Sequence, residues 1–227
     1  MKNYRLIAAF FVFILLLVPI GFRRYFAALL DGEIQSHVLH FHVIVMTIWC
    51  LMLIAQPILI NIKQHNFHRM LGKASYWLVP IIILSIWLVI RHSFFRMEEH
   101  LTLEDNLAQI FFPFSQMILF GGFYSLAILN KTKPPVHMRY IIVSSVSLLG
   151  PTIGRINFSS AGLGSIDMDL WVMNLTLIGF IIYDQLKKLK SQPYYIGLMT
   201  YALMNWAYYS FSSTELWQIA ARKLLVL

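Results

Sequence analysis

The sequence has few charged residues, a single cysteine and none of the short motifs that mark common enzyme classes. Only 12% of its 227 residues are charged, whereas a soluble domain contains about 25%. This shortage indicates that most of the surface faces lipid. Cys50 stands alone, so no disulfide forms within the chain and cysteine usage does not indicate a redox compartment.

The missing motifs exclude several reaction types. The chain contains no Gly-x-Ser-x-Gly, no His-Glu-x-x-His, no phosphate-binding loop and no cysteine cluster. Hydrolysis by an activated nucleophile is therefore poorly supported. Whether the protein is an enzyme of another kind stays open at this level.

Apolar residues are abundant, and they gather in seven long runs. A spanning helix needs about 20 mostly apolar residues, and the backbone inside a bilayer must satisfy its own hydrogen bonds, as a helix does. The sequence therefore predicts an all-α, polytopic transmembrane bundle of about seven spans, with residues 1–227 forming one membrane domain. The expected spans are Tyr4–Gly21, Val38–Ile62, Leu71–Ile90, Leu107–Leu129, Tyr140–Ile156, Leu170–Leu186 and Tyr195–Phe211. The tail from Trp217 to Leu227 is expected to be a short interfacial helix.

The net charge of +8 is a signal of topology and not of nucleic-acid binding. When the connections are assigned alternately to two sides, the N-terminal side receives eleven cations and one acid, Asp184. The other side receives seven cations and nine acids. Lys and Arg accumulate on the cytoplasmic side. We expect a multi-pass protein of the plasma (inner) membrane with the N-terminus inside and the C-terminus outside. Its expected partner is the lipid bilayer, no nucleic acid is expected, and protein partners cannot be inferred.

The second span contains a polar stripe, which we define as His42, Trp49 and Gln56. These residues recur every seven positions, and seven residues return to within about 20° on a helix. Polar groups are costly in hydrocarbon and usually face the bundle interior. We therefore expect the polar stripe to point inward. Packing alone accounts for Trp49, while His42 is the member that favours a binding role.

A second group of candidates lies at the cytoplasmic ends of the third and fifth spans. Here His68 is followed by Arg69, and His137 is followed two residues later by Arg139. Two imidazoles at one depth can ligate a haem iron or share a transition metal such as copper, and the arginines could balance haem propionates or another anion. The alternative is that these side chains simply contact lipid headgroups.

Arg155 is the candidate at the outer end of the fifth span. It either extends to water or faces His42 across an outer cavity as an anion-binding group. His92 is a further possible partner for His42 on that side. The cofactor-binding candidates are thus His42, His68, His137, Arg69, Arg139 and Arg155, with His68 and His137 as the metal candidates.

The ordered motifs resemble a family of bacterial seven-helix membrane proteins that has no assigned activity. The resemblance rests on Gly21-Phe22, His42, Gln56 and His68-Arg69-x-Leu71-Gly72 in the first three spans. It continues in His137-x-Arg139, Leu149-Gly-Pro151 and Gly154-Arg155. It implies an integral membrane protein of bacterial origin in which these positions matter.

A looser similarity is to transmembrane b-type cytochromes of the ascorbate-reducible kind, which pair histidines from alternate helices. That similarity implies haem b between His68 and His137. The fourth span has no histidine to pair with His42, so a second haem is not implied.

Three functions follow from these observations. The first is a redox or metal protein that binds haem b, or copper, through His68 and His137 or through His42 with an outer partner. The second is a small-molecule transporter or permease that uses the polar stripe as its pathway. The third is a non-catalytic assembly factor for a larger membrane complex.

Overall fold

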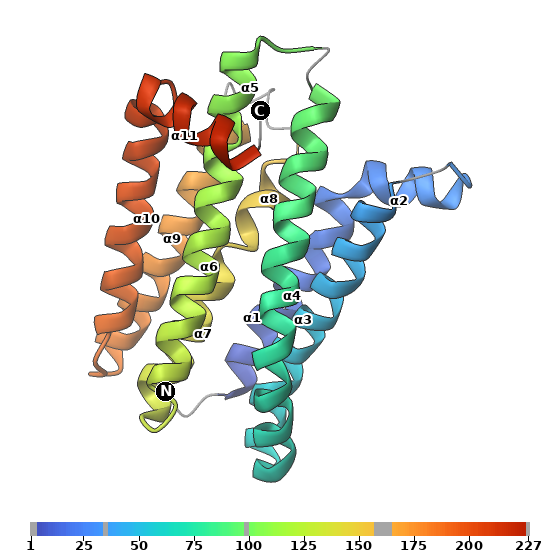
Figure 1. The fold of residues 1–227 in the computed structure, drawn as a ribbon. Helices are drawn as coiled ribbons and strands as arrows, with labels where there is room; N and C mark the ends of the chain where they lie inside the picture. Colours follow the sequence, from blue (N-terminus) through green and yellow to red (C-terminus); the bar gives the residue numbers. More distant parts are fainter. Residues whose placement is uncertain (1–3, 34–35, 98–99, 157–164, 226–227) are drawn as a thin grey trace.

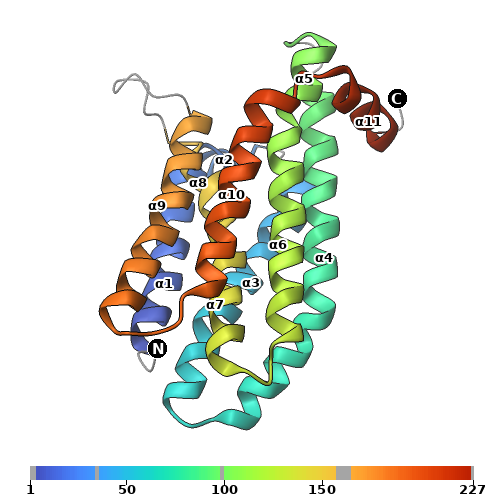
Figure 2. The same cartoon turned by 90° about the vertical axis from the view of Figure 1, so that its left-hand side faces the viewer.

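The chain folds into a bundle of helices that run side by side (Figures 1 and 2). The computed structural model describes residues 4–33, 36–97, 100–156 and 165–225, and these residues form helices and turns without any strand. The helices are α1 (Tyr4–Gly21), α2 (Arg23–Leu30), α3 (His37–Asn61), α4 (His65–Met97), α5 (Leu103–Gln109), α6 (Phe111–Leu129), α7 (Pro134–Val146), α8 (Leu149–Ile153), α9 (Ser165–Leu186), α10 (Gln192–Phe211) and α11 (Glu215–Leu225).

Local sequence signals set several helix starts. The Ser36 hydroxyl accepts the Val38 N–H at the start of α3, 3.2 Å away. Thr102 likewise caps α5 by accepting from the Asp105 N–H at 3.2 Å. Proline stands in the first turn of α7 and of α10, where its missing N–H removes no helix hydrogen bond.

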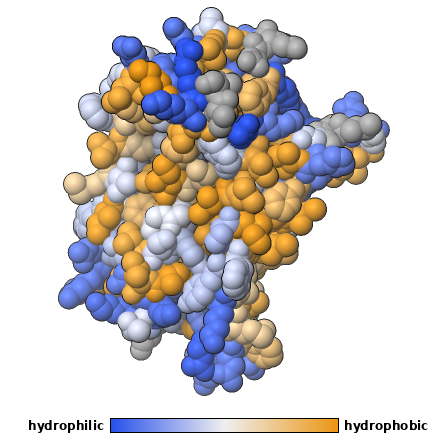
Figure 3. Space-filling view, viewed as in Figure 1, coloured by the Kyte–Doolittle hydropathy of each residue, from blue (hydrophilic) through white to orange (hydrophobic). Residues whose placement is uncertain are grey.

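Four apolar segments are long enough to cross a membrane, which is compatible with a membrane protein. Within the described residues they are Tyr4–Gly21, His37–Asn61, His65–Met97 and Leu103–Leu129, the last of which combines α5 and α6. A shorter apolar helix covers Trp171–Leu186 in α9. On the face drawn in Figure 3, hydrophobic residues cover the middle and hydrophilic residues gather toward the upper and lower ends. The predicted helical bundle is confirmed, and the number of seven spans stays a prediction.

Helix α4 is longer than the expected span Leu71–Ile90. It begins at His65 and continues to Met97. The polar residues at both ends do not stop the helix, because their side chains reach water or the interface while the backbone keeps its hydrogen bonds. Consequently His68 lies in the first turn of α4 and not in a connection before it.

The expected span Tyr140–Ile156 is not one continuous helix, because a break at Ser147 and Leu148 divides it into α7 and α8. Pro151 explains the position of the break: proline has no N–H, and its ring clashes with the carbonyl four residues earlier, which here belongs to Ser147. Other groups satisfy the freed carbonyls. The Tyr201 hydroxyl donates to the Val143 carbonyl at 3.1 Å, and the Ser147 hydroxyl donates to the Ser144 carbonyl at 2.6 Å.

The C-terminal helix α11 packs on protein, which corrects the expectation of a purely interfacial tail. Its buried side chains are Trp217, Ala221 and Leu225. They join Phe94 and Leu107 in a second apolar cluster at the end of the bundle that holds the C-terminus (Figure 1). The Trp217 indole N–H donates to the Leu107 carbonyl at 2.8 Å. This hydrogen bond and the buried face fix α11 against α5.

Candidate functional site

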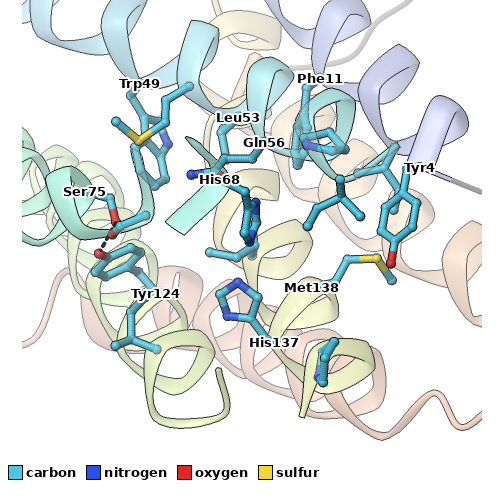
Figure 4. Close-up of a pocket in the computed structure, with 18 of the residues that line it drawn as sticks. Tyr4, Phe11, Trp49, Leu53, Gln56, His68, Ser75, Tyr124, His137 and Met138 are labelled. Atoms are coloured by element: carbon cyan, nitrogen blue, oxygen red, sulfur yellow. Dashed lines mark hydrogen bonds between the residues drawn. The ribbon is translucent and has the colours of Figure 1, made fainter. Parts of the chain in front are cut away.

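A cavity of about 180 Å³ lies among α1, α3, α4, α6 and α7 (Figure 4). It sits near the end of the bundle that carries the α3–α4 and α6–α7 connections, because His68 and His137 open α4 and α7 there. Its wall is mostly apolar. The residues with an N–H or hydroxyl group in the side chain that line it from the helices are Tyr4, Trp49, Gln56, His68, Ser75, Tyr124 and His137. A largely apolar pocket with a few convergent polar groups is the usual form of a small-molecule site.

The Gln56 amide of α3 is bound to the first turns of α4. Its oxygen accepts the Gly72 N–H at 3.1 Å, and its nitrogen donates to the His68 carbonyl at 3.2 Å. The same nitrogen contacts Nδ1 of His68. The amide must have this orientation, since the reverse would set its nitrogen against the Gly72 N–H. Nδ1 of His68 therefore accepts, and the neutral imidazole carries its proton on Nε2.

His137 has the opposite tautomer. Its Nδ1 lies 2.8 Å from the Ala127 carbonyl oxygen. A carbonyl can only accept, so Nδ1 carries the proton and Nε2 of the neutral ring carries a lone pair. Figure 4 shows the His68 ring between Gln56 and His137, beside the same cavity. The two imidazoles thus bring one N–H donor and one acceptor to one place.

Trp49 lines the cavity farther from the α3–α4 connection and has an unpaired donor. The side chain is 2% exposed, and its ring meets Phe120 and Tyr124 edge-on at centroid distances of 5.7 and 5.9 Å. Its indole Nε1 is buried and has no hydrogen-bond partner among the described residues. A buried polar group without a partner calls for an explanation such as a ligand.

Ser75 and Tyr124, which sequence reasoning missed, complete the polar wall. The Ser75 hydroxyl donates to the Gly72 carbonyl at 2.6 Å. The Tyr124 hydroxyl lies 2.7 Å from the Ser75 oxygen and must donate to it, because serine has only one proton to give. Ser75 lies seven residues after His68 on α4, a spacing that returns to nearly the same helix face. Tyr124 lies on α6, so no sequence spacing relates it to His68.

The arginines beside the two histidines do not line the cavity, contrary to the expected anion-binding role. Arg69 is exposed and donates to the Asn66 side chain at 2.6 Å. Arg139 is buried, and its Nε donates to Oδ2 of Asp184 at 2.6 Å. Helix geometry explains why each arginine lies away from the cavity that its neighbouring histidine lines, since each residue advances by about 100° around the helix. Arg139 therefore points about 200° away from His137.

Toward the other end of the bundle, the His42 side chain of α3 is hydrogen-bonded to Ser85 of α4. The Ser85 hydroxyl donates to the Ile82 carbonyl at 2.7 Å, so its oxygen accepts the Nδ1 proton of His42 at 3.0 Å. The expected partner His92 lies seven residues beyond Ser85, which is about 10 Å farther along the helix axis. All three residues of the polar stripe face neighbouring helices in this structure.

Arg155 follows α8, close enough to His42 for an electrostatic interaction. Its guanidinium lies 4.5 Å from the Phe22 ring centroid and donates to the Pro151 carbonyl. It also interacts with Asp169, which precedes the apolar part of α9. Burial raises the pKa of Asp169 to about 8, against the opposing effect of Arg155. Arg155 thus lies beside the Asp169 carboxyl group and does not line the cavity among α1, α3, α4, α6 and α7.

Comparison with known proteins adds no relative. No family model, no curated protein and no solved structure matches the chain. The functional argument therefore rests on the cavity.

Proposed function

We propose that this chain is a seven-span plasma-membrane protein that binds a small polar molecule in the cavity between α3, α4 and α7, as a transporter or permease does. Trp49 carries the argument, because this residue lines the cavity and its buried indole N–H has no hydrogen-bond partner among the described residues. A ligand that accepts from this N–H would satisfy it. Leaving a buried donor unpaired costs about 1–3 kcal/mol.

The polar groups define what such a ligand must offer. Nε2 of His68 donates, Nε2 of His137 accepts, and the Trp49 indole donates. A suitable molecule therefore has two acceptor sites and one donor, as amides and carboxylic acids have. The cavity of about 180 Å³ corresponds to the liquid volume of about six waters, so the ligand has few heavy atoms.

Indole and imidazole NMR signals test the proposal. Acetamide, which is small and has both acceptor and donor groups, is titrated into ¹⁵N-labelled protein in detergent micelles. We expect saturable shifts of the Trp49 indole N–H, assigned through Trp49→Phe. His68→Ala and His137→Ala should weaken the shift, while His65→Ala, an exposed site three residues before His68, should not.

Native mass spectrometry of the protein extracted from membranes gives a second measurement. A co-purified small molecule should be present in the parent and in His65→Ala and lost in His68→Ala. Uptake of that molecule into proteoliposomes then tests transport. Acetamide shifts that persist unchanged in both cavity variants would contradict binding at this site.

A second candidate is a redox or metal protein that uses His68 and His137, because both imidazoles line one cavity. Two features weigh against it. Gln56 holds the His68 proton on Nε2, so only His137 offers a lone pair, and metal ligands must be deprotonated. The cavity is also smaller than the roughly 300–1,000 Å³ of drug-sized sites. Absorption spectra of oxidised and reduced protein, with metal analysis on the same sample, distinguish this candidate from the first.

A further inference from the structure

Helix α2 projects from the side of the bundle and buries none of its side chains (Figure 1). Leu30 is 87% exposed and Leu29 is 46% exposed. The helix follows α1 after a single residue, Phe22, and ends at the turn around Asp31 and Gly32. An exposed helix with large apolar side chains needs a partner that covers them.

The two faces of α2 differ in chemistry. At about 100° per residue, Phe26, Leu29 and Leu30 lie on one side. Arg24 lies opposite them, and Arg23 lies at the edge between the faces. An apolar face beside a cationic face is typical of helices that lie in the plane of a membrane interface.

The position of α2 along the bundle fits that interface. Helix α1 has 18 residues and rises about 27 Å, close to the roughly 30 Å hydrocarbon thickness. Helix α2 begins where this rise ends. A hydrogen bond of 2.6 Å between the Tyr25 hydroxyl and Nδ1 of His40 holds α2 beside the start of α3. Burial raises the pKa of the Tyr25 phenol.

We propose that α2 is an interfacial helix that binds the phospholipid leaflet at the outer end of α1. This inference rests on the membrane insertion in the proposed function. Phe26, Leu29 and Leu30 enter the acyl boundary, while the guanidinium groups of Arg23 and Arg24 bind lipid phosphates. Helix α11 has a similar amphipathic pattern, but its Trp217, Ala221 and Leu225 side chains are buried against protein, whereas α2 buries none of its side chains.

Spin-label accessibility tests the proposal in the full chain. Single cysteines are placed at Leu30, Arg24, Leu16 and Lys131 in a Cys50→Ala background, and the labelled proteins are reconstituted into phosphatidylcholine and phosphatidylglycerol vesicles. Leu16 is 64% exposed on α1 and reports lipid, while Lys131 is exposed in the α6–α7 turn and reports water. The ratio of oxygen to water-soluble nickel collisions should be several-fold higher at Leu30 than at Arg24.

Three results overturn the proposal. Equal water access at Leu30 and Arg24 would put α2 in solvent, and shielding of Leu30 from both collision partners would indicate a second protein copy as its cover. The third is an unchanged ratio of oxygen to nickel collisions at Leu30 in the double variant Arg23→Gln/Arg24→Gln. Loss of the phosphate contacts should lower this ratio several-fold. Lys63→Gln is the control for loss of a positive charge elsewhere. Water access at Leu16 as well would show that membrane insertion itself has failed.

Discussion

The Gln56 side chain on α3 determines which nitrogen of His68 on α4 carries the proton. The amide nitrogen can only donate to Nδ1, so the imidazole faces the rest of the cavity with an N–H. A change at Gln56 should therefore alter the chemistry of His68 without altering His68 itself.

Gln56→Glu tests this relationship. A carboxylate cannot donate, so Nδ1 of His68 should become the donor and the lone pair should move to Nε2. The ¹⁵N spectrum of histidine-labelled protein measures the tautomer, with the His68 signals assigned through His68→Ala. The signals of exposed His65 should not move. An unchanged His68 tautomer in Gln56→Glu would contradict the assigned hydrogen bond.

Arg139→Leu should strongly destabilise the protein. It would leave the Asp184 carboxylate, whose side chain is fully buried, without its cation. Breaking a buried ion pair from one side costs about 3–5 kcal/mol, and the double variant Arg139→Leu/Asp184→Leu should recover much of this loss. The measurement is the free energy of unfolding in detergent micelles. Arg69→Leu is the matched control, because that arginine is exposed, and its effect should stay within about 0.5 kcal/mol.

Gly21→Ala should separate α1 from α8. A Cβ at Gly21 would collide with the backbone carbonyl of Thr152, which cannot rotate away as a side chain can. Overpacking of this kind costs about 1–3 kcal/mol. At Gly179 on α9, a Cβ would meet nothing within 4 Å, so Gly179→Ala is the control. Equal melting temperatures for the two variants would argue against the close α1–α8 contact.

Reporter fusions test the proposed topology. The positive-inside distribution puts Lys131 in the cytoplasm, and seven crossings put Leu227 outside. A phosphatase that is active only outside the cytoplasm should therefore be active after Leu227 and inactive after Lys131. A cytoplasmic reporter should give the reverse pattern. Activity of the same reporter at both sites would require an even number of crossings between them.

The histidine candidates show how far the sequence could predict the site. His68 and His137 were expected at one depth because both open apolar helices, and both line the cavity. Their bonds to Gln56 and the Ala127 carbonyl could not be predicted, because such contacts depend on the lateral packing and rotation of separate helices. The same limit explains why Tyr124 was missed and why Arg139 was assigned to a bound anion and not to the Asp184 side chain. Ser75 stands seven residues after His68 on α4, so its place near that histidine could have been predicted from spacing.

The position of a helix could be predicted where the hydropathy of that one segment is enough to define it. Hydropathy located the long apolar segments but missed the ends of α4 by six and seven residues, and the eight-residue α2 was too short to show as an apolar run. Pro151 was visible in the sequence, but a proline inside a span does not by itself specify a break, and α3 and α4 continue through Pro57 and Pro80. The break after α7 needs the Tyr201 hydroxyl from α10 to satisfy a freed carbonyl.

The contact between Gly21 and Thr152 also orders events during biosynthesis. Thr152 emerges from the ribosome about 130 residues after Gly21, which at about 5–20 residues per second is a delay on the order of 10 s. During that interval α1 lacks one of its neighbours. Helix α8 has five residues and is too short to span a bilayer alone, so in the proposed membrane arrangement its packing against α1 follows the insertion of α1. A chaperone or insertase that shields α1 during this delay would act on the face around Gly21.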